Sequence, residues 1–399
     1  MLNVTRLLCG LDQPMDTLRY GRGPGSPASA AARKPVVVWN VSRTCNLRCV
    51  HCYSDSDSKR YEGELSFPEG TALLDDLAAY GVPAVLLSGG EPLARPDILE
   101  LAQYARSLGL KVTISTNGTL ITPARAAQIK AIGITYVGIS LDGIGPTNDV
   151  FRGVKGAFKR TVAGIRNCKA VGQKVGLRLT LSPATVDDLE AIFDFIEAED
   201  IDRACFYHLV PSGRGSSLLT LGTEKTRAAM QTIFRRTRAF AAAGKPREIL
   251  TVDNHADAAF LYLTLLDEDP VAAQAVYELL AWNGGAAHSS GTGIANVDTQ
   301  GNVHPDQFFQ GVTLGNVRER AFSAIWTDHP FLAKLRDRKR YIEGRCTDCR
   351  FFDVCGGNFR ARAFNATGNL WASDPGCYLF DEEIRSSQSV GAPGAFATI

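Results

Sequence analysis

Apolar segments of strand length alternate with amphipathic segments of helix length through the first half of the chain, and this alternation constrains the fold more than any other feature. The strand-like segments begin with VVVWNV and continue over residues 84–88, 112–116, 136–140, 176–181 and 204–210. Helical patterns lie between them, one of them opened by a capping box of Ser66 and Glu69. Parallel strands need crossover helices, so six βα units predict an α/β fold with a parallel sheet. A partial (β/α)6 TIM-like barrel fits this number best, with functional residues at the C-terminal ends of its strands.

Composition divides the chain into four parts. Residues 1–34 are expected to be a flexible N-terminal extension, because 20–34 are rich in Gly, Pro, Ser and Ala without apolar periodicity. Residues 35–222 should form the partial barrel, and residues 223–282 have a helical pattern that predicts a connector. Residues 283–399 begin with a Gly-rich strand-and-turn stretch and contain a second group of cysteines, which predicts a C-terminal domain.

Charge and hydropathy exclude several classes of partner. The 43 basic and 42 acidic residues nearly cancel, so general binding to nucleic acid is not expected. No apolar stretch approaches the roughly 18 residues needed to span a bilayer, and the N-terminus lacks a signal pattern. We therefore expect a cytoplasmic protein that does not contact a membrane.

Seven of the ten cysteines fall into two tight groups, which in a reducing compartment indicates metal ligation. The first group is a C-x3-C-x2-C run directly after the first predicted strand, formed by Cys45, Cys49 and Cys52. Three thiolates can hold a four-iron cluster with one iron open for a ligand, whereas structural zinc normally takes four ligands. His51 could complete a zinc site, but its place inside the loop makes that geometry awkward. The scattered cysteines are expected to be inert packing thiols: Cys9, Cys168 and Cys205.

This cysteine run, placed after the first strand of a six-unit βα array, resembles the radical S-adenosylmethionine (AdoMet) superfamily. The resemblance implies that the open iron chelates AdoMet and that an electron from the cluster cleaves it to a 5′-deoxyadenosyl radical. His51 occupies the position where the family usually has an aromatic residue beside the adenine. A second family motif, SGGEP, ends the next predicted strand and by resemblance binds the methionine ammonium. Its residues are Ser88, Gly89, Gly90, Glu91 and Pro92.

Weaker matches to the same family occur at the ends of the following strands. Those expected near the ribose are Ser115, Thr116 and Asn117. Those that resemble the carboxylate-binding positions and their support are Ser140, Asp142 and Arg152. The alternative interpretation of all six is that they form turns or lie at the surface. Asn148 stands where relatives often have His, so it is assigned no role.

The second cysteine group has the spacing C-x2-C-x5-C-x21-C, through Cys346, Cys349, Cys355 and Cys377. Four thiolates close a site, and on spacing alone structural zinc is a serious alternative. The upstream motif favours iron–sulfur, because the pattern resembles the auxiliary-cluster ligands of SPASM and twitch C-terminal domains. Ligands for a further cluster are missing, since Phe359 replaces one family cysteine, and His288 and Asp306 lie roughly where cysteines would flank Gly301. We therefore expect two [4Fe–4S] clusters, one with AdoMet and one auxiliary.

Nearly the whole chain after residue 35 is identified as a member of the radical proteins of haem d1 biosynthesis, the NirJ family. Segments outside the cofactor motifs carry this resemblance, among them LTVDNHADAAFLYL and NVHPDQF. Membership implies an iron-bearing tetrapyrrole substrate, didecarboxysirohaem, which loses two propionate side chains, and an electron donor such as a flavodoxin or ferredoxin.

Three other functions compete with this one. A haem synthase of the alternative pathway is chemically close but leaves vinyl groups. A peptide-modifying enzyme shares the C-terminal domain, but the roughly 35 residues before the first strand are too few for a leader-binding domain. A non-catalytic electron carrier is disfavoured, because electron transfer gains nothing from an open iron.

A polyanionic ring needs cationic partners and an apolar wall. The candidate carboxylate partners are Arg178, Arg214, Arg360 and Arg362. Phe308, Phe309 and the Gly-rich stretch 284–293 are expected to form one wall. His288 and His304 are expected to be hydrogen-bonded loop histidines, and ligation of the substrate iron is the alternative role.

Overall fold

A computed structural model describes residues 1–13, 16–20, 34–283 and 289–385. Its centre is a sheet in which seven strands, β2 to β8, pair in parallel in chain order. These strands are β2 (Val36–Ser42), β3 (Val85–Gly89), β4 (Val112–Thr116), β5 (Tyr136–Ser140), β6 (Val175–Leu181), β7 (Arg203–His208) and β8 (Glu248–Val252). The first six are the strands expected from the sequence, so the partial barrel is confirmed.

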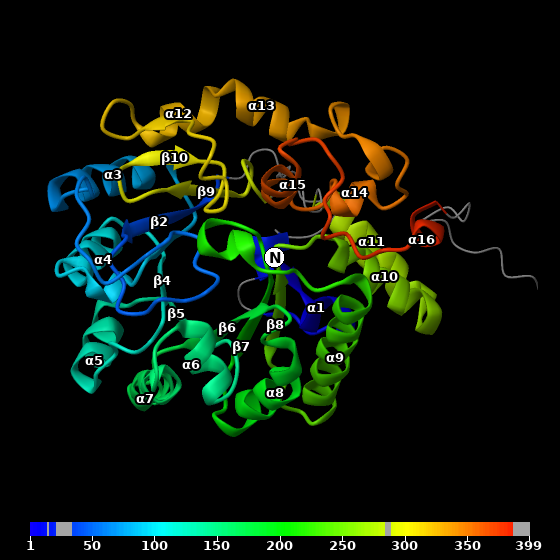
Figure 1. Cartoon of the computed structure of the whole chain (residues 1–399), viewed down its shortest axis with the longest axis horizontal. Coiled ribbons are helices and arrows are strands. Elements are labelled where there is room, and N and C mark those ends of the chain that lie inside the picture. Colours follow the sequence, from blue (N-terminus) through cyan, green and yellow to red (C-terminus); the bar gives the residue numbers. More distant parts are fainter. Residues whose placement is uncertain (14–15, 21–33, 284–288, 386–399) are drawn as a thin grey trace, which may run out of the picture.

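Helices follow the strands and cover the outside of the sheet (Figure 1). They are α3 (Phe67–Tyr80), α4 (Ile98–Ser107), α5 (Pro123–Ile132), α6 (Pro146–Arg152), α7 (Ala157–Ala170) and α8 (Leu189–Ala198). The capping box at α3 forms as predicted, because Ser66 Oγ accepts from the Glu69 amide and the Glu69 carboxylate accepts from the Ser66 amide. The apolar face of α8, including Leu189, Phe193 and Ile196, belongs to the continuous core under the sheet.

The first residues of the chain are folded, although the sequence predicted a flexible extension. β1 (Leu2–Asn3) pairs with β8 in antiparallel orientation, and α1 (Val4–Cys9) and α2 (Asp16–Tyr20) follow it. The Asn3 amide donates to Tyr20 Oη at 2.9 Å, and Thr5 Oγ1 donates to the Arg247 carbonyl at 2.5 Å. A two-residue strand is too short to produce a periodic pattern, so composition alone suggested disorder. Residues 21–33 of the predicted extension lie outside the described residues.

The predicted helical connector contains a strand as well. α9 (Thr223–Ala242) leads into β8, and α10 (Ala256–Glu268) and α11 (Pro270–Trp282) follow. All five residues of β8 are buried. This strand extends the barrel by one parallel unit, so residues 223–282 build part of its wall. The turn from β8 into α10 consequently lies at the C-terminal ends of the strands.

The C-terminal region continues the same sheet. β9 (Ile294–Val297) pairs in parallel with β2, and β10 (Asn302–His304) and β11 (Gly315–Asn316) add antiparallel strands. The later helices are α12 (Phe322–Asp328), α13 (Pro330–Arg336), α14 (Phe352–Cys355), α15 (Arg360–Thr367) and α16 (Asp381–Arg385). In Figure 1, α12 to α15 lie on the side of the molecule opposite α5, α7 and α8. Among the described helices, none combines the length and apolar character of a membrane span.

Short turns of 3-10 helix connect several elements. They are η2 (Pro92–Ala94), η3 (Val186–Asp188), η4 (Gly213–Ser217), η6 (Arg338–Arg340) and η7 (Gly344–Cys346). Two of them matter for the site, because η4 follows β7 beside the first cysteine group and η7 contains a cysteine of the second group.

Candidate active site

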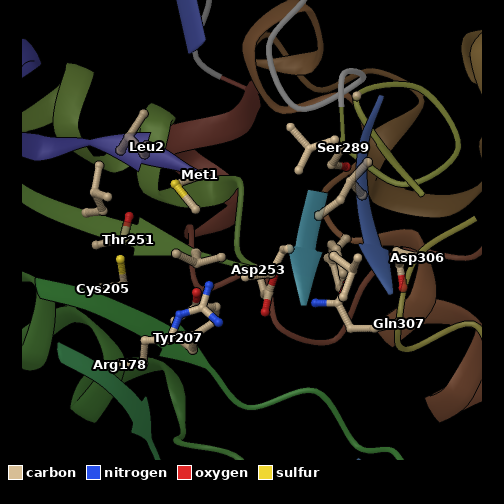
Figure 2. Close-up of a pocket in the computed structure, with 18 of the residues that line it drawn as sticks. Met1, Leu2, Arg178, Cys205, Tyr207, Thr251, Asp253, Ser289, Asp306 and Gln307 are labelled. Atoms are coloured by element: carbon tan, nitrogen blue, oxygen red, sulfur yellow. The ribbon is translucent and has the colours of Figure 1, made fainter. Parts of the chain in front are cut away.

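A cavity of about 700 Å³ runs along the inside of the barrel and reaches the C-terminal region. Figure 2 shows Arg178 and Tyr207 on one side of this space and Asp306 and Gln307 on the other, with Asp253 between them. Pockets of this size accommodate small organic molecules and cofactors. The lining includes residues at the C-terminal ends of strands, such as Ser88 and Ser140, residues before strands, such as Pro83, and residues of the C-terminal region, so the cavity extends beyond the strand ends at which functional residues were expected.

The first cysteine group, Cys45, Cys49 and Cys52, lies in the loop between β2 and α3. The end of α6 accepts two backbone hydrogen bonds from this loop, donated by Arg48 and Val50. Arg214, in η4, donates to the carbonyls of Cys49 and Ser56 at 3.0 and 2.8 Å. Arg214 was predicted to pair a substrate carboxylate, but the structure uses it to hold the cysteine loop.

Polar N–H groups surround the thiols of this loop. The amides of Leu47 and Ser56 lie 3.4 Å from the Sγ atoms of Cys45 and Cys52, respectively. Burial is the main cause that raises the pKa of Cys45 to about 12, and the neighbouring thiolates of Cys49 and Cys52 act in the same direction. Thiolates in such a place need bound positive charge, and N–H donors to sulfur are typical support of iron–sulfur clusters. The donor set fits a four-iron cluster.

The SGGEP motif packs directly against the cysteine loop. Gly89 has a φ of 128°, and a Cβ there would overlap the Ser42 carbonyl oxygen. A Cβ at Gly90 would lie 2.5 Å from the Thr44 carbonyl oxygen. The Gly90 amide donates to the Ser42 carbonyl at 2.7 Å. The two glycines thus permit close approach between two chain segments, whereas the sequence had suggested that they permit close approach of a ligand.

Glu91 and Pro92 of the motif are buried and lie outside the lining of the cavity. The Glu91 carboxylate accepts from the Thr116 hydroxyl at 2.7 Å and from the Asn117 amide at 2.8 Å. Burial raises the pKa of Glu91, and these hydrogen bonds oppose that effect. Glu91 therefore joins the ends of β3 and β4 and positions the residues around it.

The predicted AdoMet contacts at the ends of β3, β4 and β5 differ in what they face. Ser88, Ser115 and Ser140 line the cavity at the ends of three neighbouring strands. Asn117 turns toward the cysteine loop, where its Nδ2 donates to Asn46 Oδ1 at 2.9 Å and lies 3.9 Å from Cys45 Sγ. The serines can meet a ligand directly, whereas Asn117 supports the loop.

Asp142, Arg152 and His51 form a cluster on the cysteine-loop side of the cavity. Arg152 Nη2 pairs with Asp142 Oδ2, and Arg152 Nη1 lies 3.6 Å from Cys49 Sγ. His51 stacks on Phe151 with ring centroids 4.5 Å apart, and its Nε2 is 3.9 Å from Asp142 Oδ2. Burial lowers the pKa of His51 to about 4, so its ring is neutral. His51 is therefore positioned to stack beside a cofactor bound at the loop.

Cys346, Cys349, Cys355 and Cys377 of the second group lie in the C-terminal region, and none of them forms a disulfide. Burial is the main cause that raises the pKa of Cys355, and the charges of the other three thiolates act in the same direction, so the four side chains lie within electrostatic reach of one another. Within the described ranges, no three His, Cys, Asp or Glu side chains surround a point suited to a single metal ion. The four neighbouring thiols provide the ligand number of a closed cluster site.

Two of the predicted carboxylate-binding arginines are occupied by the protein itself. Arg362 forms a two-pronged pair with Asp374 at 2.8 and 2.9 Å. Arg360 Nη1 donates to the carbonyls of Leu370 and Ala372 at 2.9 and 2.8 Å. Both guanidinium groups are buried. They stabilise the C-terminal region, so the prediction that they bind substrate is wrong.

Arg178 on β6 differs from these arginines. It lines the cavity, its Nη1 donates to Ser115 Oγ, and its guanidinium lies over the Tyr207 ring at 5.3 Å from the centroid. Its Nε has no hydrogen-bond partner, and no carboxylate of the described residues lies within ion-pair distance of it. Arg178 is half-buried with its Nε enclosed, and an anionic ligand in the cavity would offset the cost of removing this charge from water.

The predicted aromatic wall is partly correct. Phe308 lines the cavity together with Phe359, whereas Phe309 does not line it and is fully buried in the apolar cluster to which Phe359 also belongs. Residues 284–288 of the Gly-rich stretch, including His288, lie outside the described residues. His304 is a hydrogen-bonded loop histidine as expected, because its Nδ1 lies 2.8 Å from the Val312 carbonyl and its Nε2 lies 3.4 Å from Asp298 Oδ2.

Sequence reasoning missed the turn between β8 and α10. Asp253 adopts a φ of 65° there, its carboxyl group is buried, and its Oδ2 has no partner among the described residues. Asn254 Nδ2 donates to the Gly376 carbonyl at 2.8 Å, and the His255 amide donates to Asn358 Oδ1 at 2.6 Å. The only sequence signal was a run of polar residues directly after a short apolar run, in the segment LTVDNHAD.

Asp306 and Cys205 are two further residues whose place in the cavity was not foreseen. Asp306 accepts from the Ser290 hydroxyl and from the Phe308 amide, and burial raises the pKa of Asp306 to about 6. Cys205 lines the cavity, whereas Cys168 is a packing thiol in the core as expected. Burial raises the pKa of Cys205, so it stays a protonated thiol.

Two family models match the chain, one over the first cysteine group and one over a region that ends within the second group. Residues 39–196 match the Radical SAM superfamily, and residues 289–350 match the SPASM iron–sulfur cluster-binding domain. Solved structures share the fold at low identity. The structure of Streptococcus suis SuiB bound to S-adenosylmethionine has a TM-score of 0.69 at 18% identity, over 87% of this chain and 78% of that one. Native anSMEcpe with bound AdoMet has a TM-score of 0.67 at 17% identity, over 85% and 93%.

Curated relatives match over almost their whole length. Fe-coproporphyrin III synthase of Methanosarcina barkeri is 50% identical over 96% of this chain and 99% of that protein. Pre-heme d1 synthase of Dinoroseobacter shibae is 43% identical over 90% and 89%. AdoMet-dependent heme synthase of Methanosarcina barkeri is 32% identical over 86% and 95%. Together with the three-cysteine loop, the four-cysteine group and the cavity between them, these matches show that the chain belongs to the radical SAM enzymes with a SPASM domain that act on modified tetrapyrroles.

Proposed function

We propose that this enzyme forms iron coproporphyrin III by radical removal of carboxyl-bearing side chains from an iron tetrapyrrole. The 50% identity with Fe-coproporphyrin III synthase, over nearly all of both chains, supports this product. The observation that carries the proposal is the pairing of this likeness with a cavity of about 700 Å³ in which Arg178 has no carboxylate partner among the described residues. A polyanionic ring would supply such a partner.

We further propose two [4Fe–4S] clusters. Cys45, Cys49 and Cys52 would hold the first with one iron open, and the four C-terminal cysteines would hold the single auxiliary cluster. AdoMet bound to the first cluster supplies a carbon radical once a donor such as a flavodoxin or ferredoxin reduces that cluster. Ser88, Ser115, Ser140 and His51 border the cavity near this loop and are the proposed AdoMet contacts.

The residues of the chain would place the ring in a definite way. Arg178 would pair one peripheral carboxylate, while Phe308 and Phe359 would lie against the apolar ring. Asp306 is protonated over a wider pH range than an ordinary aspartate, so it can donate a hydrogen bond to a carboxylate that enters its part of the cavity. Carboxylate contacts would thus lie on opposite sides of the cavity, at Arg178 and at Asp306.

Removal of two propionates on the way to haem d1 is the second candidate, and it is the reaction that the sequence resemblance implied. Its support is the 43% identity with pre-heme d1 synthase over 89% of that protein. Haem synthesis with vinyl products has weaker support, from a relative that is 32% identical. The first candidate is favoured because its relative is more similar and matches at almost full length.

One anaerobic assay separates the three reactions. The reconstituted enzyme is incubated with AdoMet, a reductant and didecarboxysirohaem, and the product masses are determined. Iron coproporphyrin III keeps four propionates, so its formation requires loss of the acetate groups, whereas the haem d1 reaction removes propionates. The expected product is iron coproporphyrin III. A product that has lost two propionates would favour the second candidate, and conversion of added iron coproporphyrin III to vinyl products would favour haem synthesis.

A further inference from the structure

Among the described residues, three histidines line the cavity, and they differ in what their ring nitrogens contact. His208 uses both nitrogens within the protein, because Nε2 is 3.0 Å from Asp257 Oδ2 and Nδ1 is 3.4 Å from Asn254 Nδ2. His51 stacks on Phe151 inside the first cysteine loop. His255 is the third, and its ring makes no hydrogen bond with any described residue.

The His255 ring is a free base held at the cavity wall. Burial lowers its pKa well below the ordinary value, so the imidazole is neutral. Nδ1 is enclosed without a partner, so Nε2 is the nitrogen that can reach a ligand in the cavity. Phe359 packs edge-on against the ring with centroids 5.9 Å apart.

The backbone around His255 is fixed by hydrogen bonds to Asn358 of the C-terminal region. Its amide donates to Asn358 Oδ1 at 2.6 Å, and Asn358 Nδ2 donates to Asn254 Oδ1 at 2.9 Å. Asp253 and Asn358 both have positive φ values, 65° and 62°. Such conformations persist where the surrounding structure imposes them, and they concentrate at functional sites. The turn therefore presents His255 in one orientation.

We propose that His255 is an axial ligand of the tetrapyrrole iron. The inference rests on the proposed function, since it needs an iron-bearing ring in the cavity. A neutral imidazole is a common ligand of haem iron, and Nε2, which has no hydrogen-bond partner among the described residues, is the nitrogen that would bind it. Arg178 faces the same cavity from β6, so a ring could be held by its iron and by a peripheral carboxylate at once.

Other cavity residues are poorer candidates for this ligand. His51 lies next to Cys52 and stacks on Phe151, on the side where AdoMet is proposed to bind. Cys205 is packed among the apolar side chains of Leu250 and Val252, and burial keeps its thiol protonated. Both nitrogens of His208 already have partners.

The test compares two rings that differ only in the metal. Iron coproporphyrin III and metal-free coproporphyrin III are titrated into the cluster-loaded enzyme and into His255→Ala, with absorption and electron paramagnetic resonance spectra of the bound iron. Wild-type enzyme should show a histidine-ligated iron signature. His255→Ala should lose that signature and bind the iron ring about tenfold more weakly, while its affinity for the metal-free ring stays unchanged. Added imidazole should restore nitrogen ligation in the variant.

The remaining outcomes overturn the proposal in different ways. Equal loss of affinity for both rings would show that His255 only packs against the macrocycle. A histidine signature that persists in His255→Ala but disappears in His51→Ala would transfer the role to His51. If neither ring binds to the wild-type enzyme, the proposed function fails and the axial ligand with it. Cluster iron content confirms folding of each variant, and His255→Gln replaces His255→Ala if the latter loses its clusters.

Discussion

At the scale of single residues, the four candidate arginines differ in which groups of the protein their guanidinium groups contact. Arg362 reaches Asp374 only 12 positions away, and Arg360 reaches carbonyls of the same C-terminal segment. Arg214 reaches the cysteine loop, more than 150 positions away in the sequence. Arg178 alone of the four lines the cavity and lacks an ion-pair partner among the described residues. Sequence spacing could not separate them, because the partners are set by tertiary contacts.

Arg178 should therefore control ring affinity. Its replacement by Gln removes a charge-assisted hydrogen bond, typically about 1.5–3 kcal/mol, so iron coproporphyrin III should bind roughly 10 to 100 times more weakly. Arg178→Lys keeps the positive charge but lacks the planar guanidinium, so its affinity for the ring should lie between those of wild type and Arg178→Gln. Absorption titration under anaerobic conditions measures the affinities.

Arg203 provides a matched control for this comparison. It lines the same cavity, but its guanidinium pairs with Glu248 and lies over the Tyr136 ring. Arg203→Gln should change ring affinity much less than Arg178→Gln. Equal effects of the two changes would mean that the cavity responds to any lost positive charge, and Arg178 would lose its assigned role.

Asp306 should make stability depend on pH. Its folded pKa of about 6 lies above the ordinary value of 3.8, because burial disfavours the carboxylate. Between these values the folded chain binds more protons than the unfolded chain, so the free energy of unfolding falls as pH rises, by at most about 3 kcal/mol. Asp306→Asn removes this dependence and can still bond Ser290 and Phe308.

The measurement is the thermal midpoint of both proteins at equal cluster loading. The advantage of Asp306→Asn over wild type should grow by about 1 kcal/mol between pH 5 and pH 7 and then level off. A gap between the two midpoints that stays constant over this range would show that Asp306 does not titrate there.

At the scale of elements, strands with their own apolar pattern were predictable and strands without one were not. The six βα units appear in the sequence because each strand is an apolar run of at least five residues with a helical pattern after it. β8 was not predicted, because its five residues stand within a region whose overall pattern is helical. β1 was missed because two residues form no pattern, and β9 pairs with β2 across 250 positions. Long-range pairing leaves little trace in local periodicity.

In the candidate site, too, the parts with a local sequence pattern were predictable and the parts brought together by the fold were not. Both cysteine groups and the SGGEP motif are local patterns that the sequence shows directly, and in the structure the motif packs against the first cysteine loop. The turn Asp253–His255 carries no comparable pattern, so its place in the cavity emerged only from the fold. Glu91 and Asn117 belong to predicted motifs, yet they position other residues because their hydrogen bonds point into the protein.

The two cysteine groups should be separable in function. Replacing Cys45, Cys49 and Cys52 by Ala should leave one cluster and abolish cleavage of AdoMet, because the open iron is lost. Replacing the four C-terminal cysteines should also leave one cluster, while AdoMet cleavage continues and turnover of the tetrapyrrole falls. Iron analysis and release of 5′-deoxyadenosine measure both effects. Tightly bound zinc in protein purified anaerobically from iron-rich cells would favour a structural zinc site in the C-terminal region instead.

At the scale of the whole molecule, the cavity is enclosed by segments that are far apart in the sequence. β6 and β7 contribute Arg178 and Tyr207, the turn after β8 contributes His255, and the C-terminal region contributes Asp306 and Phe308. β9 continues the barrel sheet, so the C-terminal region shares a hydrogen-bonded framework with the barrel. A ring that occupies this cavity must therefore touch both regions.

Ring binding should consequently slow amide hydrogen exchange in distant segments at once. Iron coproporphyrin III should protect peptides that contain residues 204–210, 253–258 and 305–309, because opening any of these walls would break contacts with the ligand. A peptide from α5 (Pro123–Ile132) on the outside of the barrel is the internal control and should exchange at an unchanged rate. Protection confined to residues 305–309 would place the ring on the C-terminal region alone. In that case Arg178 and His255 could not both contact it, and the assignment of the common cavity as the tetrapyrrole site would be wrong.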